Sequence, residues 1–191
     1  MAWLGDLRSI VGGPRRFFDT VKPDRTSDLF LMNMGVCAAI AFVGVLADEF
    51  IRRQGLPETA GDAVLVIVRP IAMGLGVGAG FGILTMVEIL GLRLFSRRLV
   101  RPIPYRTLWA ICSHAAVGWI VGAALLSAVW GTASYWHAPL NRAIKYQVPN
   151  GLTLLIPLLV AVVIGMVTFE TLAFVGERRC RYANIPSDEG V

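Results

Sequence analysis

The sequence predicts an all-α integral membrane protein, a bundle of four transmembrane helices with an N-terminal amphipathic surface helix and both termini in the cytoplasm. Of its 191 residues, 55% are hydrophobic and only 16% are charged, and the mean hydropathy is +0.64. A soluble domain carries more surface charge than this. Four apolar runs can each cross a hydrocarbon core of about 30 Å as a helix. They are Leu29 to Ala47, Ile71 to Leu92, Leu108 to Trp130 and Leu152 to Val175.

The orientation follows from the distribution of basic residues between the loops. Thirteen of the 18 lysines and arginines lie before the first run, between the second and third runs, or after the fourth. The positive-inside rule therefore places both termini and the middle loop in the cytoplasm. Arginine far outnumbers lysine and no N-x-[ST] sequence occurs. We therefore expect a bacterial cytoplasmic (inner) membrane.

The chain divides into three segments around these runs. Residues 1–28 are expected to be a cytoplasmic interfacial segment, residues 29–176 the transmembrane domain, and residues 177–191 a short disordered tail. Trp3, Leu4, Leu7, Ile10 and Val11 recur at helical spacing. Such a helix is expected to lie on the membrane surface, and a docking helix for a partner is the alternative. Pro157 is expected to kink the fourth helix.

Glycines form two ridges on the second run. Gly74, Gly78 and Gly82 recur at a spacing of four, and Gly76 with Gly80 forms a second ridge beside them. Gly118 and Gly122 provide a similar small surface on the third run. Because small residues let helix backbones approach closely in lipid, we expect the second and third helices to pack tightly together.

Polar residues of the four runs fall at one depth. With a rise of about 1.5 Å per residue, Asn33, Glu88, His114 and Glu170 each lie roughly 6 to 10 Å inside the cytoplasmic boundary. Ionisable groups at that depth are costly and mark functional sites. Three interpretations remain open for this polar layer: hydrogen bonds that fix helix register, a proton or ion relay, and a metal site, which no ligand spacing supports.

Several function classes lack support. The net charge of +5 comes from residues beside the runs, which suits anionic lipid better than nucleic acid. Gly74, Gly76 and Ala79 resemble a dinucleotide fingerprint, but they lie inside an apolar run rather than after a strand. Ser113 and His114 are neighbours on one helix and point about 100 degrees apart. We therefore expect no enzyme activity, no cofactor, no metal and no soluble substrate.

The chain resembles the Yip-domain family, polytopic membrane proteins named for their interaction with Ypt/Rab GTPases. Over residues 4 to 130, the resemblance rests on Pro14, Phe17 and Phe18 before the first run, on the glycine-rich second run, and on Tyr105 leading to Ser113 and His114. The family typically has five spans, whereas four are predicted here. The resemblance implies a non-enzymatic role in membrane organisation or trafficking.

These observations favour a scaffold or accessory subunit of a larger membrane protein complex. Its partners would be the lipid bilayer and other integral membrane proteins, in a hetero-complex or a homo-oligomer. The alternative is a small ion- or proton-coupled transporter that uses Glu88, His114 and Glu170.

Overall fold

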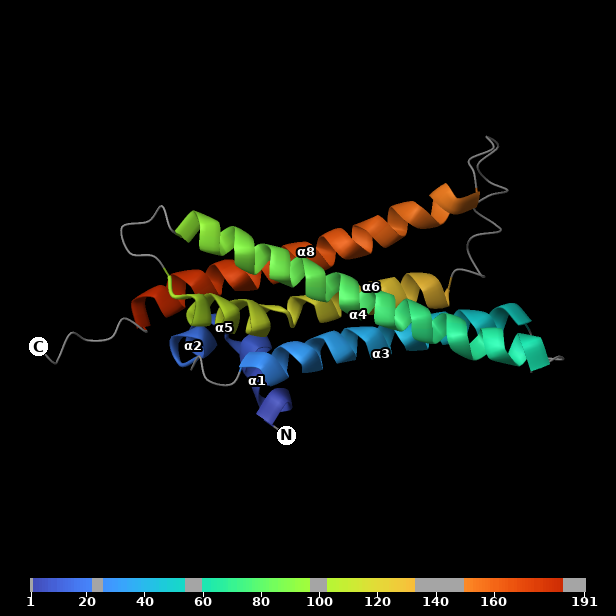
Figure 1. Ribbon diagram of the computed structural model, residues 1–191, viewed down its shortest axis with the longest axis horizontal. Helices are drawn as coiled ribbons and strands as arrows, with labels where there is room; N and C mark the ends of the chain where they lie inside the picture. Colours follow the sequence, from blue (N-terminus) through green and yellow to red (C-terminus); the bar gives the residue numbers. More distant parts are fainter. Residues whose placement is uncertain (1, 22–25, 54–59, 97–102, 133–149, 184–191) are drawn as a thin grey trace, which may run out of the picture.

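The computed structural model of the chain describes residues 2–21, 26–53, 60–96, 103–132 and 150–183, and every element in these ranges is a helix (Figure 1). The helices are α1 Ala2–Gly12, α2 Pro14–Asp19, α3 Thr26–Arg53, α4 Ala60–Ser96, α5 Tyr105–Ala115, α6 Gly118–Gly131 and α8 Asn150–Ala183. The chain after Ala183, which holds most of the expected tail, lies outside the described residues.

Four helical segments are long and apolar enough to cross a membrane, as the sequence predicts. They are Asp28–Ile51, Val64–Phe95, Tyr105–Gly131 and Leu155–Cys180. Three of the helices extend beyond the predicted runs. The helix α3 continues to Arg53, α4 begins at Ala60 and passes through Pro70, and α8 reaches Ala183, so the first residues of the expected tail are helical.

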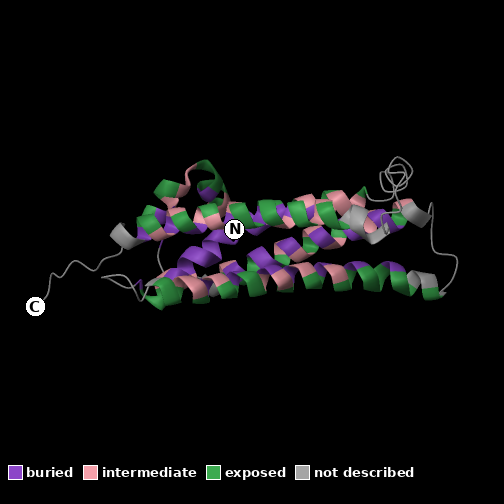
Figure 2. Ribbon diagram, turned by 90° about the horizontal axis from the view of Figure 1, so that it is seen from above, coloured by how far each residue is buried: buried purple, intermediate pink, exposed green. Residues whose placement is uncertain are grey.

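The third span occupies the centre of the molecule. Other helices bury 72% of it, against 39%, 28% and 22% for the first, second and fourth spans. Its second half, α6, packs against both α3 and α8, while α4 packs chiefly against α3. The buried residues follow this central path in Figure 2. The second and fourth spans are therefore left with long apolar faces on the outside of the protein.

The central span is interrupted at Ala116 and Val117, where α5 ends and α6 begins. The backbone N–H of Val117 donates to the carbonyl of His114 at 3.2 Å, and that of Ile120 donates to Val117 at 3.0 Å. These bonds join residues three apart, which tightens the helix into a 3₁₀ turn. The interruption therefore lies in the third span, whereas α8 runs through Pro157 without a break. We call residues 116 and 117 the tightened turn.

Glycines bring the helices together in pairs that differ from the expected ones. A Cβ atom at Gly74 would lie 2.7 Å from the carbonyl oxygen of Ala38, and one at Gly78 would lie 3.0 Å from that of Met34. The ridge of α4 therefore packs against the first span, not the third; Gly82 is in ordinary contact with the same helix. Gly118 and Gly122 of the third span face the fourth.

The contact between α6 and α8 brings the backbones of two spans together. A Cβ at Gly118 would lie 2.5 Å from the backbone nitrogen of Phe169, and one at Gly122 would lie 3.0 Å from the Cα of Gly165. Nearby, the Trp119 ring is stacked between Phe81 of α4, with ring centroids 4.6 Å apart, and Phe169 of α8, at 5.2 Å. One indole thus joins three spans.

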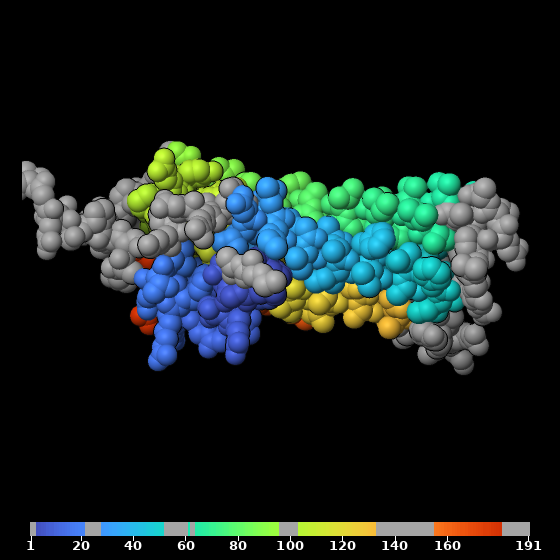
Figure 3. Space-filling view, turned by 90° about the horizontal axis from the view of Figure 1, so that it is seen from below, coloured from blue at the N-terminus to red at the C-terminus, as the bar shows by residue number. Residues whose placement is uncertain are grey.

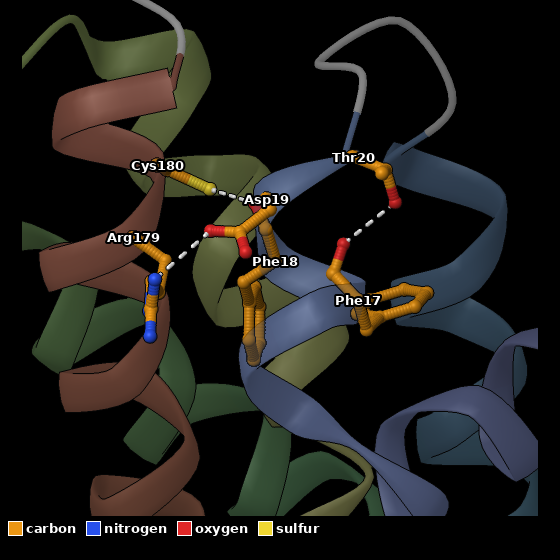
Figure 4. A network of polar contacts seen from close by, with 6 residues as sticks. All are labelled: Phe17, Phe18, Asp19, Thr20, Arg179 and Cys180. Atoms are coloured by element: carbon orange, nitrogen blue, oxygen red, sulfur yellow. Dashed lines mark hydrogen bonds and ion pairs between the residues drawn. The ribbon is translucent and has the colours of Figure 1, made fainter.

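One end of the molecule, which we call the arginine-rich end, contains α2, the last turns of α4 and α8, and the start of α5 (Figure 1). Here α2 docks on α8 through buried Phe18, which lies against Gly176. The Cys180 thiol donates to the Phe18 carbonyl at 3.2 Å, and Arg179 pairs with Asp19 at 3.8 Å (Figure 4). The N-terminal segment is thus packed against the spans rather than lying on lipid alone.

The opposite end carries buried charge that the sequence placed in a loop. Glu49 is 1% exposed and forms an ion pair with Arg69, whose side chain is 46% exposed. Asp48 is also buried. Because Glu49 belongs to α3 and Arg69 to α4, the pair ties the first two spans together at this end.

We predict that Gly118→Ala destabilises the protein, because the new methyl group meets the backbone of α8, which cannot rotate away. Overpacking of this kind costs about 1 to 3 kcal/mol. Gly80→Ala is the matched control, since a Cβ there meets nothing within 4 Å. Thermal unfolding in mild detergent measures both variants. An equal midpoint for Gly118→Ala and the wild type would contradict the packing described here.

Candidate functional site

The predicted polar layer is divided into two parts by α5. Asn33 and His114 lie on the side of α5 that faces the N-terminal helices, where Trp3 and Phe17 contact them. Glu88 and Glu170 lie together on another side, near Cys112. Since Cys112 and His114 are two residues apart, their side chains point about 200 degrees apart around the helix. The four residues therefore do not form one site.

Asn33 acts as a structural bridge between three segments. Its side chain is 1% exposed. The indole Nε1 of Trp3 donates to its Oδ1 at 2.8 Å, and its Nδ2 donates to the backbone carbonyl of Ser113 at 3.0 Å. In a regular α-helix that carbonyl would accept from Val117, whose N–H instead bonds His114. The Asn33 amide thus donates to the Ser113 carbonyl in place of the Val117 N–H, which the tightened turn directs to His114.

His114 forms a hydrogen bond within its own helix. It is 6% exposed, and its Nδ1 lies 2.7 Å from the carbonyl oxygen of Ala110. A carbonyl can only accept, so this nitrogen carries the hydrogen. The ring also contacts Phe17 of α2, with centroids 5.1 Å apart. These contacts fit a residue that positions α2 on the central span.

Glu88 and Glu170 form a carboxyl pair across two spans. Glu88 of α4 and Glu170 of α8 are close enough to interact electrostatically, and Glu177 lies near enough to act on the same group. Both members of the pair are half-buried. The Cys112 thiol of α5 is close enough to interact electrostatically with all three carboxyl groups. Two negative charges this close repel each other, and a proton on either carboxyl group relieves the repulsion, so the pair is suited to hold a proton.

Thr85 completes a second buried hydrogen-bond chain, toward the middle of the spans. Its Oγ1 donates to the carbonyl of Phe81 at 2.9 Å and accepts from the Trp119 Nε1 at 3.0 Å. Both residues are almost fully buried. Among the buried side chains of the described ranges, the hydroxyl oxygen of Ser113 is the one polar atom without a hydrogen-bond partner.

No group of three or more His, Cys, Asp or Glu side chains within the described ranges is placed to hold a metal ion. The comparisons with known proteins add no assignment: no family model, no curated protein and no solved structure matches the chain.

Sequence reasoning missed several members of these networks. Glu177 follows Glu170 by seven residues, so it shares the same helix face, and this spacing could have identified it. No spacing in the sequence identifies Trp3 or Cys112 as a partner, because their contacts join segments far apart in the sequence. Glu49 was assigned to a loop because the apolar run before it ends at Ala47.

We predict that Thr85→Val destabilises the protein, because it leaves the buried Trp119 N–H without an acceptor while preserving side-chain volume. An unsatisfied buried donor costs about 1 to 3 kcal/mol. Thr171→Val is the matched control, since that exposed hydroxyl bonds only to the Val167 carbonyl of its own helix. Thermal unfolding of Thr85→Val, Trp119→Phe and the double variant measures the coupling, and fully additive effects would rule out the bond.

Proposed function

We propose that the protein is a non-enzymatic scaffold or accessory subunit of a larger membrane protein complex, seated in a bacterial inner membrane with both termini in the cytoplasm. One observation carries this proposal: the second span has two small-residue faces, and the helices of the described ranges cover only one of them. The other face suits a transmembrane helix of a neighbouring subunit.

The covered face contains the glycines that meet α3. On the other side of the helix, Ala72, Gly76 and Gly80 recur at a spacing of four, and nothing lies within 4 Å of a Cβ built on either glycine. Ile83 and Val87 extend this stripe and are 64% and 59% exposed. Small residues at a spacing of four, flanked by branched apolar ones, are the usual helix-association surface in lipid.

The internal polar residues also support a structural role. Asn33, Thr85 and His114 have hydrogen bonds to the protein itself, which leaves little of the predicted layer for a transported solute. The resemblance to the Yip-domain family points in the same direction, because its implied role is membrane organisation.

The scaffold proposal predicts that Gly76→Leu weakens association with the partner while the protein itself stays folded. A leucine there fills the space that the neighbouring backbone would need. Gly78→Leu is the contrasting control, because it faces α3 and should destabilise the chain itself. The protein is isolated from its native membrane in mild detergent. Mass spectrometry then identifies the companion, which is the subunit that co-purifies with it, and measures its stoichiometry. A companion retained by Gly76→Leu at wild-type stoichiometry, or a wild-type protein that migrates alone, would contradict the proposal.

A second candidate function is proton- or ion-coupled transport. The observation in its favour is the carboxyl pair of Glu88 and Glu170, which joins two spans and can hold a proton. Paired carboxyl groups inside a membrane are typical of proton pathways. His114, which the sequence assigned to this pathway, bonds elsewhere, so the relay would depend on the carboxylates.

Glu88→Gln and Glu170→Gln separate the two functions, because glutamine keeps a hydrogen bond and removes the titrating proton. The scaffold proposal predicts that both variants keep the companion at wild-type stoichiometry and that wild-type proteoliposomes show no proton flux above empty liposomes under a pH gradient. A flux present in the wild type and lost in both variants, with assembly unchanged, would establish the transport function instead.

A further inference from the structure

The first helix, α1, has three distinct sides. Trp3 and Ile10 face the protein, and Ile10 is 2% exposed. At about 100 degrees per residue, Leu4 and Val11 lie together on one flank, and they are 58% and 75% exposed. Ser9 lies on the other, polar flank and is also exposed. An exposed apolar flank opposite a polar one is the pattern of a helix at a membrane interface.

The depth of α1 is set by its hydrogen bond to the first span. Trp3 bonds Asn33, which lies five residues inside the first residue of that span, Asp28. At about 1.5 Å per residue, the contact between Trp3 and Asn33 therefore lies about 7.5 Å inside the start of the span. Interfacial helices insert by about 5 to 10 Å. α1 runs across the long axis of the molecule in Figure 1, and the N-terminal helices stand out from one flank in Figure 3.

The charges around α1 indicate the kind of surface that it contacts. Arg8 is exposed beside the Leu4 and Val11 flank, and Arg15 and Arg16 are exposed on α2. Arginine side chains at this level extend to the phosphate groups. The partner that fits both the apolar flank and these cations is the anionic leaflet in which the arginine-rich end is seated.

The inner side of α1 connects this lipid contact to the central span. Trp3 donates to the Oδ1 of Asn33, and the amide of the same side chain donates to the Ser113 carbonyl at the tightened turn. We propose that α1 is a lipid-seated latch: the anionic leaflet holds its Leu4 and Val11 flank, and this seating keeps Trp3 on Asn33 and so holds the tightened turn. The proposal rests on the assignment of this end to the cytoplasmic leaflet.

Release of α1 has a defined consequence at the turn. Asn33 then loses its indole donor, and its amide is no longer oriented toward Ser113. The Ser113 carbonyl loses its partner in turn, and the N–H of Val117 is the nearest group that can replace it by returning the turn to regular α-helix. Lipid contact at one helix therefore selects between two hydrogen-bond patterns in the most buried span.

The lipid contact is tested on the full chain in phosphatidylglycerol and phosphatidylethanolamine vesicles. Nitroxide labels are placed at Leu4→Cys, Val11→Cys and Ser9→Cys; the native cysteines Cys37, Cys112 and Cys180 are buried, and unsubstituted protein controls for their labelling. The labels at 4 and 11 should be relaxed by oxygen, and the label at 9 by an aqueous nickel reagent. Equal water access at all three sites, or shielding of 4 and 11 from both reagents by another protein, would overturn the proposal.

The coupling is tested by hydrogen exchange in the same vesicles. Trp3→Phe keeps the ring but removes the donor. Without that bond the turn interconverts between its two hydrogen-bond patterns, and each interconversion opens an amide, so exchange in residues 113–118 should rise about fivefold, which corresponds to the loss of one hydrogen bond. Vesicles of phosphatidylcholine alone should produce the same rise in the wild type. Ser9→Ala is the control and should leave exchange unchanged. Unchanged exchange in Trp3→Phe, or a rise of the same size in Ser9→Ala, would overturn the latch.

Discussion

The contact between the central span and its neighbours determines the rest of the structure. Gly118 and Gly122 let α6 approach the backbone of α8, and that approach stacks Trp119 between Phe81 and Phe169. The indole N–H then needs a buried acceptor, which Thr85 supplies. In lipid, where apolar side chains gain little by leaving the solvent, such close packing and a satisfied polar group are what hold helices together.

The central position of the third span also explains why the polar groups fall into separate networks. α5 packs against α3, α4 and α8, so residues of these spans at one depth end up on different sides of it. Glu88 and Glu170 meet across two spans, whereas Asn33 bonds the tightened turn. A layer that looks uniform by depth is thus a carboxyl pair and a structural bridge.

The sequence predicts the helical class and the four spans because both depend on the length and composition of local runs. The approximate depth of Glu88 and Glu170 follows from the same information, which is why the pair could be anticipated. Helix partners were predicted less well. A glycine ridge shows that something packs closely, but the ridge of Gly74 and Gly78 carries no mark of whether its partner is the first or the third span. The tightened turn was also missed, because residues 115–117 contain no helix breaker and the interruption arises from contacts with Asn33 and α8.

The ion pair of Glu49 with Arg69 has a consequence for how the chain enters the bilayer. Glu49 is buried at the far end of the first span, where an unpaired carboxylate would be costly, and its partner belongs to the next span. Before the second span enters the membrane, Glu49 lacks its ion pair with Arg69. Together, the two spans form this pair and pack the glycine face of α4 against α3 at once, so they are suited to partition into lipid as a preformed hairpin rather than one after the other.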